Sequence, residues 1–220
     1  MDNLNRMIRK ALRFLRNPYY RKVDSVKDWF YLFRSNYFRL KHGLDFAEVN
    51  DFDYDQMTVL SKKHGTEYTN GSYYYCKLML DWINVRDCEY QFIDIGSGKG
   101  KICFEVARVW QFSKVVGVEY ESRLVEAANK NKKLLDSNVA FVWSDASKYL
   151  LPDCKNIVYI FNSFDDVILK KFIDNNKESL RKNKSIILYA QNIHRTVFLN
   201  NGARALYEDL NRRQSIFIFD

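Results

Sequence analysis

Short apolar runs alternate with amphipathic stretches between residues 90 and 190. The runs are rich in Val, Ile and Phe, and their length is that of buried strands. Between them, apolar residues recur every three or four positions, as on one face of a helix. We therefore predict strands at Phe92–Ile95, Val115–Val118, Val139–Trp143, Ile157–Phe161 and Ile186–Tyr189, with helices at about 101–110, 122–135 and 165–181.

Strands that alternate with helices imply βαβ units and a parallel sheet covered by helices on both faces. We expect the end of the chain to form an antiparallel hairpin at the sheet edge, from Ala205–Leu210 and Ser215–Phe219 around a turn at 211–213. A helix over 203–213 is the competing interpretation. The predicted fold class is α/β, a Rossmann-like, mostly parallel seven-stranded sheet flanked by helices.

The first part of the chain has a different pattern. Residues 3–17 predict an amphipathic helix, with Leu, Ile and Met on one face and Arg and Lys elsewhere. Further helices are expected over about 23–40 and 72–83. Residues 43–56 are acidic and loop-like, so we divide the chain into a basic helical extension, 1–45, and an α/β domain, 46–220.

The net charge of +8 belongs to this extension. Residues 1–44 contain eleven Lys or Arg and three Asp, whereas the basic and acidic residues of the remainder cancel. Three roles are open to the basic helix: it packs on the domain, lies on an anionic membrane surface, or contacts nucleic acid. Its apolar face favours a membrane over nucleic acid, because it carries Leu, Ile and Met rather than a platform on which bases could stack.

The four cysteines form no CxxC pair and the three histidines do not cluster with them. We therefore expect neither a metal site nor a disulfide framework. Free thiols, together with the absence of a signal-peptide core or a membrane-spanning run, favour a cytoplasmic protein that could lie peripherally at the inner membrane face.

A glycine-rich turn follows the first predicted strand. Gly96, Gly98 and Gly100 lie within five residues, between that strand and the next helix, and Ser97 stands between the first two. Glycine permits a sharp turn and a close approach of backbone to ligand. In open α/β sheets, ligands bind at such turns, outside the carboxyl ends of the strands.

The charge beside this turn distinguishes between ligands. The dinucleotide fingerprint is G-x-G-x-x-G, whereas this turn reads G-x-G-x-G and carries Asp94 two residues before its first glycine. A carboxylate disfavours the pyrophosphate of a nicotinamide cofactor. It favours the sulfonium and ammonium groups of S-adenosylmethionine, since hydrogen bonds to charged groups contribute about 1.5–3 kcal/mol each.

Polar residues at the next strand ends suit the rest of a nucleoside. Glu119, followed by Tyr120, can accept hydrogen bonds from a ribose diol. Asp145, followed by Ala146, can accept from the adenine amine, or can simply cap a short helix. Asn162 ends the fourth strand, where it can face the methyl acceptor or cap the following helix.

The order FIDIGSGKGK, VVGVEYES, SDA and IFNSFDD resembles motifs I to IV of class I S-adenosylmethionine-dependent methyltransferases. The resemblance covers about residues 90–190. It implies that Asp94 and the glycine turn bind the methionine end, Glu119 the ribose and Asp145 the adenine amine. Within that superfamily the chain looks most like an uncharacterised bacterial group that is associated with surface-polysaccharide genes.

Two further segments bear on this resemblance. The group's fourth motif is Asn-Pro-Phe, whereas Ser163 replaces the proline here, so a nitrogen acceptor is not implied. The stretch Gly65–Thr69 resembles the group's lid, which would place Tyr68 and Thr69 near the methionine moiety.

The expected reaction is a direct methyl displacement for which no metal is needed. Asn162 and His194 are the candidate catalytic residues, and His194 could act as a general base on a hydroxyl or instead be merely solvated. The leading acceptor is a glycan or a bacterial surface-polysaccharide precursor. The alternatives are a protein-lysine or nucleic-acid methyltransferase, a catalytically silent cofactor-binding module and, more distantly, a nicotinamide oxidoreductase. The sequence leaves the oligomeric state open.

Overall fold

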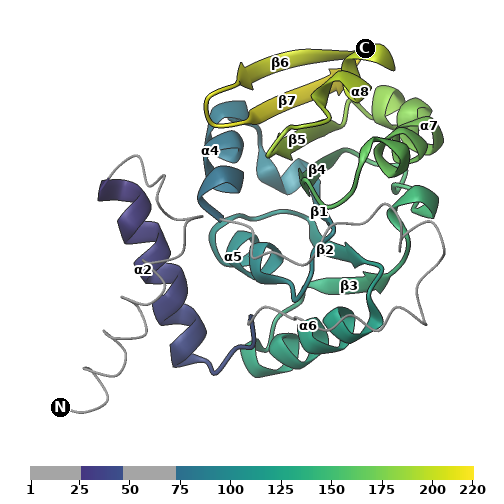
Figure 1. Ribbon diagram of the computed structural model, residues 1–220. Helices are drawn as coiled ribbons and strands as arrows, with labels where there is room; N and C mark the ends of the chain where they lie inside the picture. The colour runs from purple at the N-terminus through teal and green to yellow at the C-terminus, as the bar shows by residue number, and fades with distance from the viewer. Residues whose placement is uncertain (1–25, 47–72) are drawn as a thin grey trace. The chain divides into compact units, whose positions relative to one another are not determined.

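The computed structural model describes residues 26–46 and 73–220 (Figure 1). The chain divides into two compact units, Met1–Leu44 and Asp45–Asp220. In the first unit, helix α2 (Val26–Lys41) overlaps the second expected helix, about 23–40, and ends one residue beyond it. The predicted helix at 3–17 lies outside the described residues, and the roles assigned to 1–45 and 46–220 stay predictions.

The second unit is built on one seven-stranded sheet with the strand order β3-β2-β1-β4-β5-β7-β6. The first five strands in this order are parallel, and β7 runs antiparallel to both of its neighbours, β5 and β6, so the predicted fold class is confirmed. The strands are β1 (Gln91–Ile95), β2 (Lys114–Glu119), β3 (Ala140–Trp143), β4 (Asn156–Phe161), β5 (Ile186–Ala190), β6 (Ala203–Asp209) and β7 (Gln214–Phe219).

The end of the chain is the predicted hairpin, and the alternative helix over 203–213 is wrong. Strand β7 pairs with both β5 and β6, so that β6 forms the sheet edge. The pairing of β6 with β7 runs from Ala203 to Asp209 and is interrupted by a register shift between Ala205 and Tyr207.

The predicted helices of this unit are present within two residues of their expected bounds. They are α4 (Tyr73–Ile83), α5 (Lys101–Val109), α6 (Ser122–Leu135) and α7 (Asp166–Lys182). Helix α8 (Arg195–Asn200) was not predicted, because six residues are too few to show a helical period. Two short 3-10 helices, η3 (Asp87–Glu89) and η4 (Ala146–Lys148), complete this unit.

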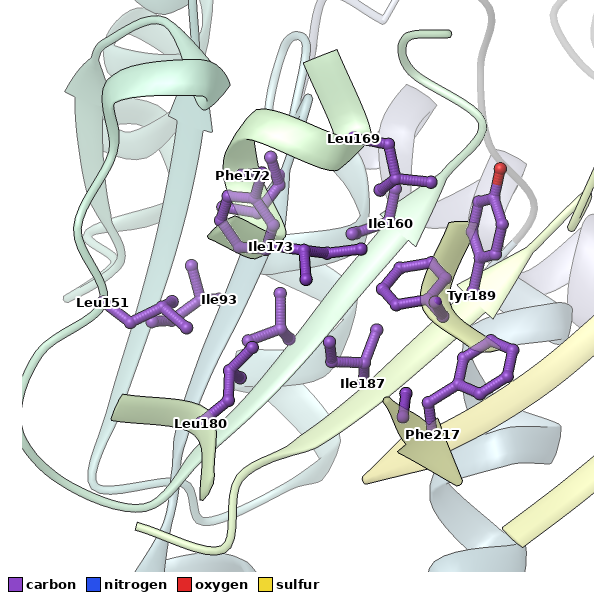
Figure 2. Close-up of a cluster of buried hydrophobic side chains, with 14 of the residues drawn as sticks. Ile93, Leu151, Ile160, Leu169, Phe172, Ile173, Leu180, Ile187, Tyr189 and Phe217 are labelled. Carbon is purple, nitrogen blue, oxygen red and sulfur yellow. The ribbon is translucent and has the colours of Figure 1, made fainter. Parts of the chain in front are cut away.

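Alternate side chains of the strands form two buried layers. Ile93, Ile160 and Ile187 face α7, where they meet Phe172 and other apolar side chains of that helix (Figure 2). These four side chains are at most 1% exposed, and the burial of each contributes about 1.5–3 kcal/mol. This layer holds β1, β4 and β5 in register, which fixes the relative positions of their carboxyl ends.

The opposite layer includes side chains of α4 and α5. Phe92 stacks on Tyr159 with ring centroids 6.3 Å apart, and Cys76 and Cys103 are fully buried. All four cysteines are free thiols. Among the described residues, no helix is long and apolar enough to cross a membrane, and no group of three or more His, Cys, Asp or Glu side chains could hold a metal ion.

Candidate functional site

The glycine turn connects β1 to α5 at the carboxyl edge of the sheet. Gly96 has φ = 85°, and a Cβ atom added there would lie 2.2 Å from Ser163 Oγ. Gly100 has φ = 82°, and a Cβ atom there would lie 2.4 Å from the Phe141 ring. Both positions therefore require glycine for backbone conformation and for space.

Hydrogen bonds join this turn to the end of β2. The amides of Gly96 and Ser97 donate to the Val118 carbonyl at 2.8 and 3.0 Å. The Gly98 amide donates to Glu119 Oε2 at 2.8 Å. The sequence-predicted residues of the first two strand ends are thus in direct contact.

Glu119 is buried, and its carboxylate accepts backbone hydrogen bonds. Besides Gly98, the amides of Tyr120 and Glu121 donate to Oε1 at 2.9 and 3.0 Å. Burial raises the pKa of this carboxyl, and the three backbone donors oppose that rise. A carboxylate has about four acceptor positions, so one stays available beyond these three bonds. The expected ribose contact stays a prediction, and Glu119 also shapes the turn itself.

Asp94 lies beneath the turn on the layer shared with α5. Its side chain is 3% exposed and faces the Cys103 thiol, whose sulfur is 3.7 Å from Oδ2. Burial raises the pKa of Asp94 to about 7; the contact with Cys103 opposes this rise and the charge of Glu119 adds to it. A nearby cation would favour the ionised carboxylate, which is the property expected of a sulfonium or ammonium site.

The ends of β2 and β3 are joined in the same way. The Ser144 amide donates to the Glu119 carbonyl at 2.9 Å. The indole of Trp143 donates to the Tyr120 carbonyl at 2.8 Å, a contact that sequence reasoning missed. Asp145, followed by Ala146, caps η4 by accepting from the Ser147 amide at 2.8 Å. The alternative of a helix cap is therefore confirmed for Asp145, while its adenine contact stays a prediction.

The end of β4 meets the glycine turn through Ser163, which stands in place of the proline of the fourth motif. Ser163 Oγ donates to the Ile95 carbonyl at 3.2 Å, whereas proline has no hydroxyl to donate. Asn162 directly precedes it in a left-handed conformation, with φ = 42°.

Asn162 does not cap the following helix, so that alternative is wrong. The N-cap of α7 is Asp165, whose carboxylate accepts from the amides of Val167 and Ile168 at 3.0 and 3.3 Å. A carboxylate one residue before the helix satisfies these amides better than an amide side chain four residues away.

His194 lies beyond the end of β5 and directly precedes α8. It is half-buried, and its backbone amide donates to the Tyr189 hydroxyl at 3.3 Å. The neighbouring Asn192 is buried and donates to Ser215 Oγ at 2.6 Å, so it fixes the loop to β7. The structure thus places His194 after a strand of the same carboxyl edge. Tyr68 and Thr69 lie outside the described residues.

Residues 87–205, more than half of the chain, match a sequence family described as a methyltransferase domain. The chain belongs to this family. It is a class I, S-adenosylmethionine-dependent methyltransferase. No curated protein matches the chain.

Solved structures show the same fold at low sequence identity. A predicted N6-adenine-specific DNA methylase from Listeria monocytogenes has a TM-score of 0.55 and 10% identity, over 69% of this chain and 51% of that one. A precorrin-6y C5,15-methyltransferase from Geobacter metallireducens has a TM-score of 0.53 and 18% identity, over 76% and 100%. A methyltransferase from Leishmania major has a TM-score of 0.52 and 14% identity, over 66% and 70%.

The methyltransferase has two features that fit the cofactor of its family. Asp94 is a buried carboxyl beside the glycine turn, where a cation would stabilise its ionised form. Ser97 Oγ is buried in the turn and has no hydrogen-bond partner within the described residues. Buried polar groups are almost always hydrogen-bonded, so this hydroxyl is a candidate ligand contact.

Proposed function

We propose that this methyltransferase binds S-adenosylmethionine at the carboxyl edge of β1 to β4 and methylates a glycan or a bacterial surface-polysaccharide precursor. The single observation that carries the cofactor site is the buried Asp94 beside a glycine turn that requires glycine at Gly96 and Gly100. The acceptor rests on the resemblance of the four motifs to the bacterial group named above.

In this proposal the residues at each strand end bind a different part of the cofactor. Asp94 faces the cations of the cofactor, while the glycine turn with Ser97 surrounds its methionine portion. Glu119 and Tyr120 bind the ribose, and Asp145 and Ala146 the adenine. Tyr68 and Thr69, outside the described residues, would cover the methionine portion.

When bound, the cofactor supplies an electrophilic methyl group, so the protein mainly has to orient the acceptor. Asn162 is suited to this role, because its left-handed backbone follows the strand next to the glycine turn. A hydroxyl acceptor must lose a proton, and His194 is the candidate base.

Labelled methyl transfer tests the acceptor. The purified protein would be incubated with S-adenosylmethionine carrying a labelled methyl group and with a bacterial extract, which is then separated into polysaccharide, protein and RNA. We expect label in the polysaccharide fraction, and much less with the Asn162→Ala variant. Label in protein or RNA would instead support one of the rival acceptors, and cofactor binding without transfer to any fraction would support a silent binding module.

We also propose that residues 1–17 lie on an anionic membrane surface, so that the protein acts at the inner face of the cytoplasmic membrane. The support is the excess of eight positive charges in 1–44. Helix α2 adds an exposed apolar side, on which Phe33 is 63% and Tyr37 51% exposed, and Arg34 and Lys41 are exposed as well.

Vesicle sedimentation tests this membrane contact. The five Lys or Arg of 1–17 would contribute on the order of 5 kcal/mol on anionic lipid, at about 1 kcal/mol each. Removal of 1–17 should therefore strongly reduce binding to anionic vesicles without changing cofactor affinity. Equal binding before and after the deletion would exclude this role.

A further inference from the structure

Lys99 is a residue of the glycine turn, between Gly98 and Gly100, and its side chain carries a positive charge. Its side chain is only 6% exposed, and its ammonium lies 2.8 Å from Asp45 Oδ2, the carboxylate of a residue 54 positions earlier. Asp45 itself is 56% exposed in its side chain. Burial of a charged lysine destabilises the folded state unless a carboxylate compensates the charge. Asp45 is the carboxylate that compensates Lys99.

Asn131 of α6 holds the backbone of both residues. Asp45 N donates to Asn131 Oδ1 at 2.9 Å, and Asn131 Nδ2 donates to the Asp45 carbonyl at 2.9 Å and to the Lys99 carbonyl at 3.2 Å. Asn131 is 1% exposed. Next to Asp45, Phe46 is buried with its ring centroid 6.4 Å from that of Phe104 in α5.

The backbone of 45–46 is thus fixed independently of the Asp45 carboxylate. Two hydrogen bonds join Asn131 to the Asp45 backbone, a third joins Asn131 to the Lys99 carbonyl, and Phe46 contacts Phe104. The Asp45 carboxylate is therefore not needed to hold residues 45–46 in place. We take its role to be compensation of the positive charge of Lys99.

The sign of that charge conflicts with the ligand. A lysine in a glycine-rich turn suits phosphate, whereas the reactive group of S-adenosylmethionine is a sulfonium cation, and its amino-acid end carries an ammonium beside a carboxylate. Like charges within several ångströms repel each other, most strongly where water is excluded. An uncompensated Lys99 would therefore weaken binding of this cofactor selectively.

We propose that Asp45 is a specificity-determining positioning residue, which neutralises Lys99 so that the glycine turn accepts a cationic cofactor. This inference rests on the proposed cofactor site. It predicts that loss of the ion pair changes the affinity for S-adenosylmethionine more than the affinity for S-adenosylhomocysteine, because the two ligands differ by the charge on sulfur.

Calorimetric titration of two single variants with both ligands tests this prediction. Asp45→Asn keeps the backbone contacts and leaves Lys99 uncompensated, so the affinity ratio of S-adenosylmethionine to S-adenosylhomocysteine should fall. Coulomb repulsion between the two positive charges predicts a fall of about three- to thirtyfold, depending on their separation and on the effective dielectric constant. Lys99→Met leaves the Asp45 carboxylate unopposed, so the same ratio should rise.

Combining Asp45→Asn with Lys99→Met should restore the ratio of the wild type. The matched control is Asp174→Asn, which removes one negative charge from the exposed Lys170–Asp174 pair of α7 and should leave the ratio unchanged.

Opposite shifts of the affinity ratio in the two single variants cannot result from general destabilisation, because destabilisation would weaken the binding of both ligands together. Equal losses for both ligands, or an unchanged ratio in both variants, would overturn the inference while leaving the proposed function intact. Failure of the wild type to bind either ligand would overturn the proposed cofactor site and this inference with it.

Discussion

Cofactor affinity should depend on pH through Asp94. Burial raises the pKa of this carboxyl from 3.8 to about 7, because the ionised form loses its hydration. That difference corresponds to about 4 kcal/mol against the charged form. A bound cation removes much of this penalty, so binding of S-adenosylmethionine is coupled to loss of the Asp94 proton.

The sign and size of the effect follow from this linkage. Below pH 7 most molecules must release a proton to bind, so affinity falls as the pH is lowered. If Asp94 is ionised in the complex, the dissociation constant should be about five times larger at pH 6 than at pH 7, and about fifteen times larger at pH 5.5. In this range the α-amino group of the ligand stays protonated, since its ordinary pKa is about 7.7–8.0.

Calorimetric titration at these three pH values measures the effect. The control is Asp94→Asn, a neutral side chain of similar shape, which should bind at least about tenfold more weakly at pH 7.5 and lose the pH dependence. Wild-type affinity that stays constant from pH 5.5 to 7, or an equal slope in Asp94→Asn, would refute this role for Asp94.

The same shift predicts the opposite trend for stability of the ligand-free protein. Its folded-state pKa is raised, so the contribution of Asp94 to stability is greatest below pH 4 and is lost as the pH rises through about 7. Asp94→Asn should reduce that loss in denaturant titrations performed across this range.

Three further substitutions test the geometry of the site. Gly96→Ala should lower both the melting temperature and cofactor affinity, because the new methyl group would lie 2.2 Å from Ser163 Oγ; an unchanged melting temperature would contradict the packing. Glu119→Ala leaves three backbone donors without their acceptor, so it should destabilise the protein by about 3 kcal/mol, which denaturant titration would detect. Asn162→Ala should reduce methyl transfer more than cofactor binding, and equal losses in the two assays would exclude a role in orienting the acceptor.

The fold could be predicted from sequence because its elements have strong local patterns. The apolar runs that begin at Phe92 and Ile157 have the length of buried strands, and the period of 165–181 is that of an amphipathic helix. Helix α8 was missed because it is too short to repeat. The choice between a hairpin and a helix at the end of the chain depended on pairing with β5, which no local pattern contains.

The sequence predicted which strand ends form the site, but not the hydrogen bonds and ion pairs between them. The order of the motifs pointed to Asp94 and Glu119, and the parallel sheet brought their strand ends together. Sequence alone could not show that the Glu119 carboxylate accepts from the Gly98 amide, because that bond depends on the path of the turn. Nor could it reveal the Asp45–Lys99 pair, whose partners are 54 positions apart.

The most direct test of the account is calorimetric titration of the purified protein with S-adenosylmethionine, with NADH as the control and Asp94→Ala as the matched variant. We expect micromolar binding of S-adenosylmethionine, no binding of NADH, and a dissociation constant at least about tenfold larger in the variant. Binding of NADH, or binding of S-adenosylmethionine that Asp94→Ala leaves unchanged, would contradict the assignment of this turn as the cofactor site.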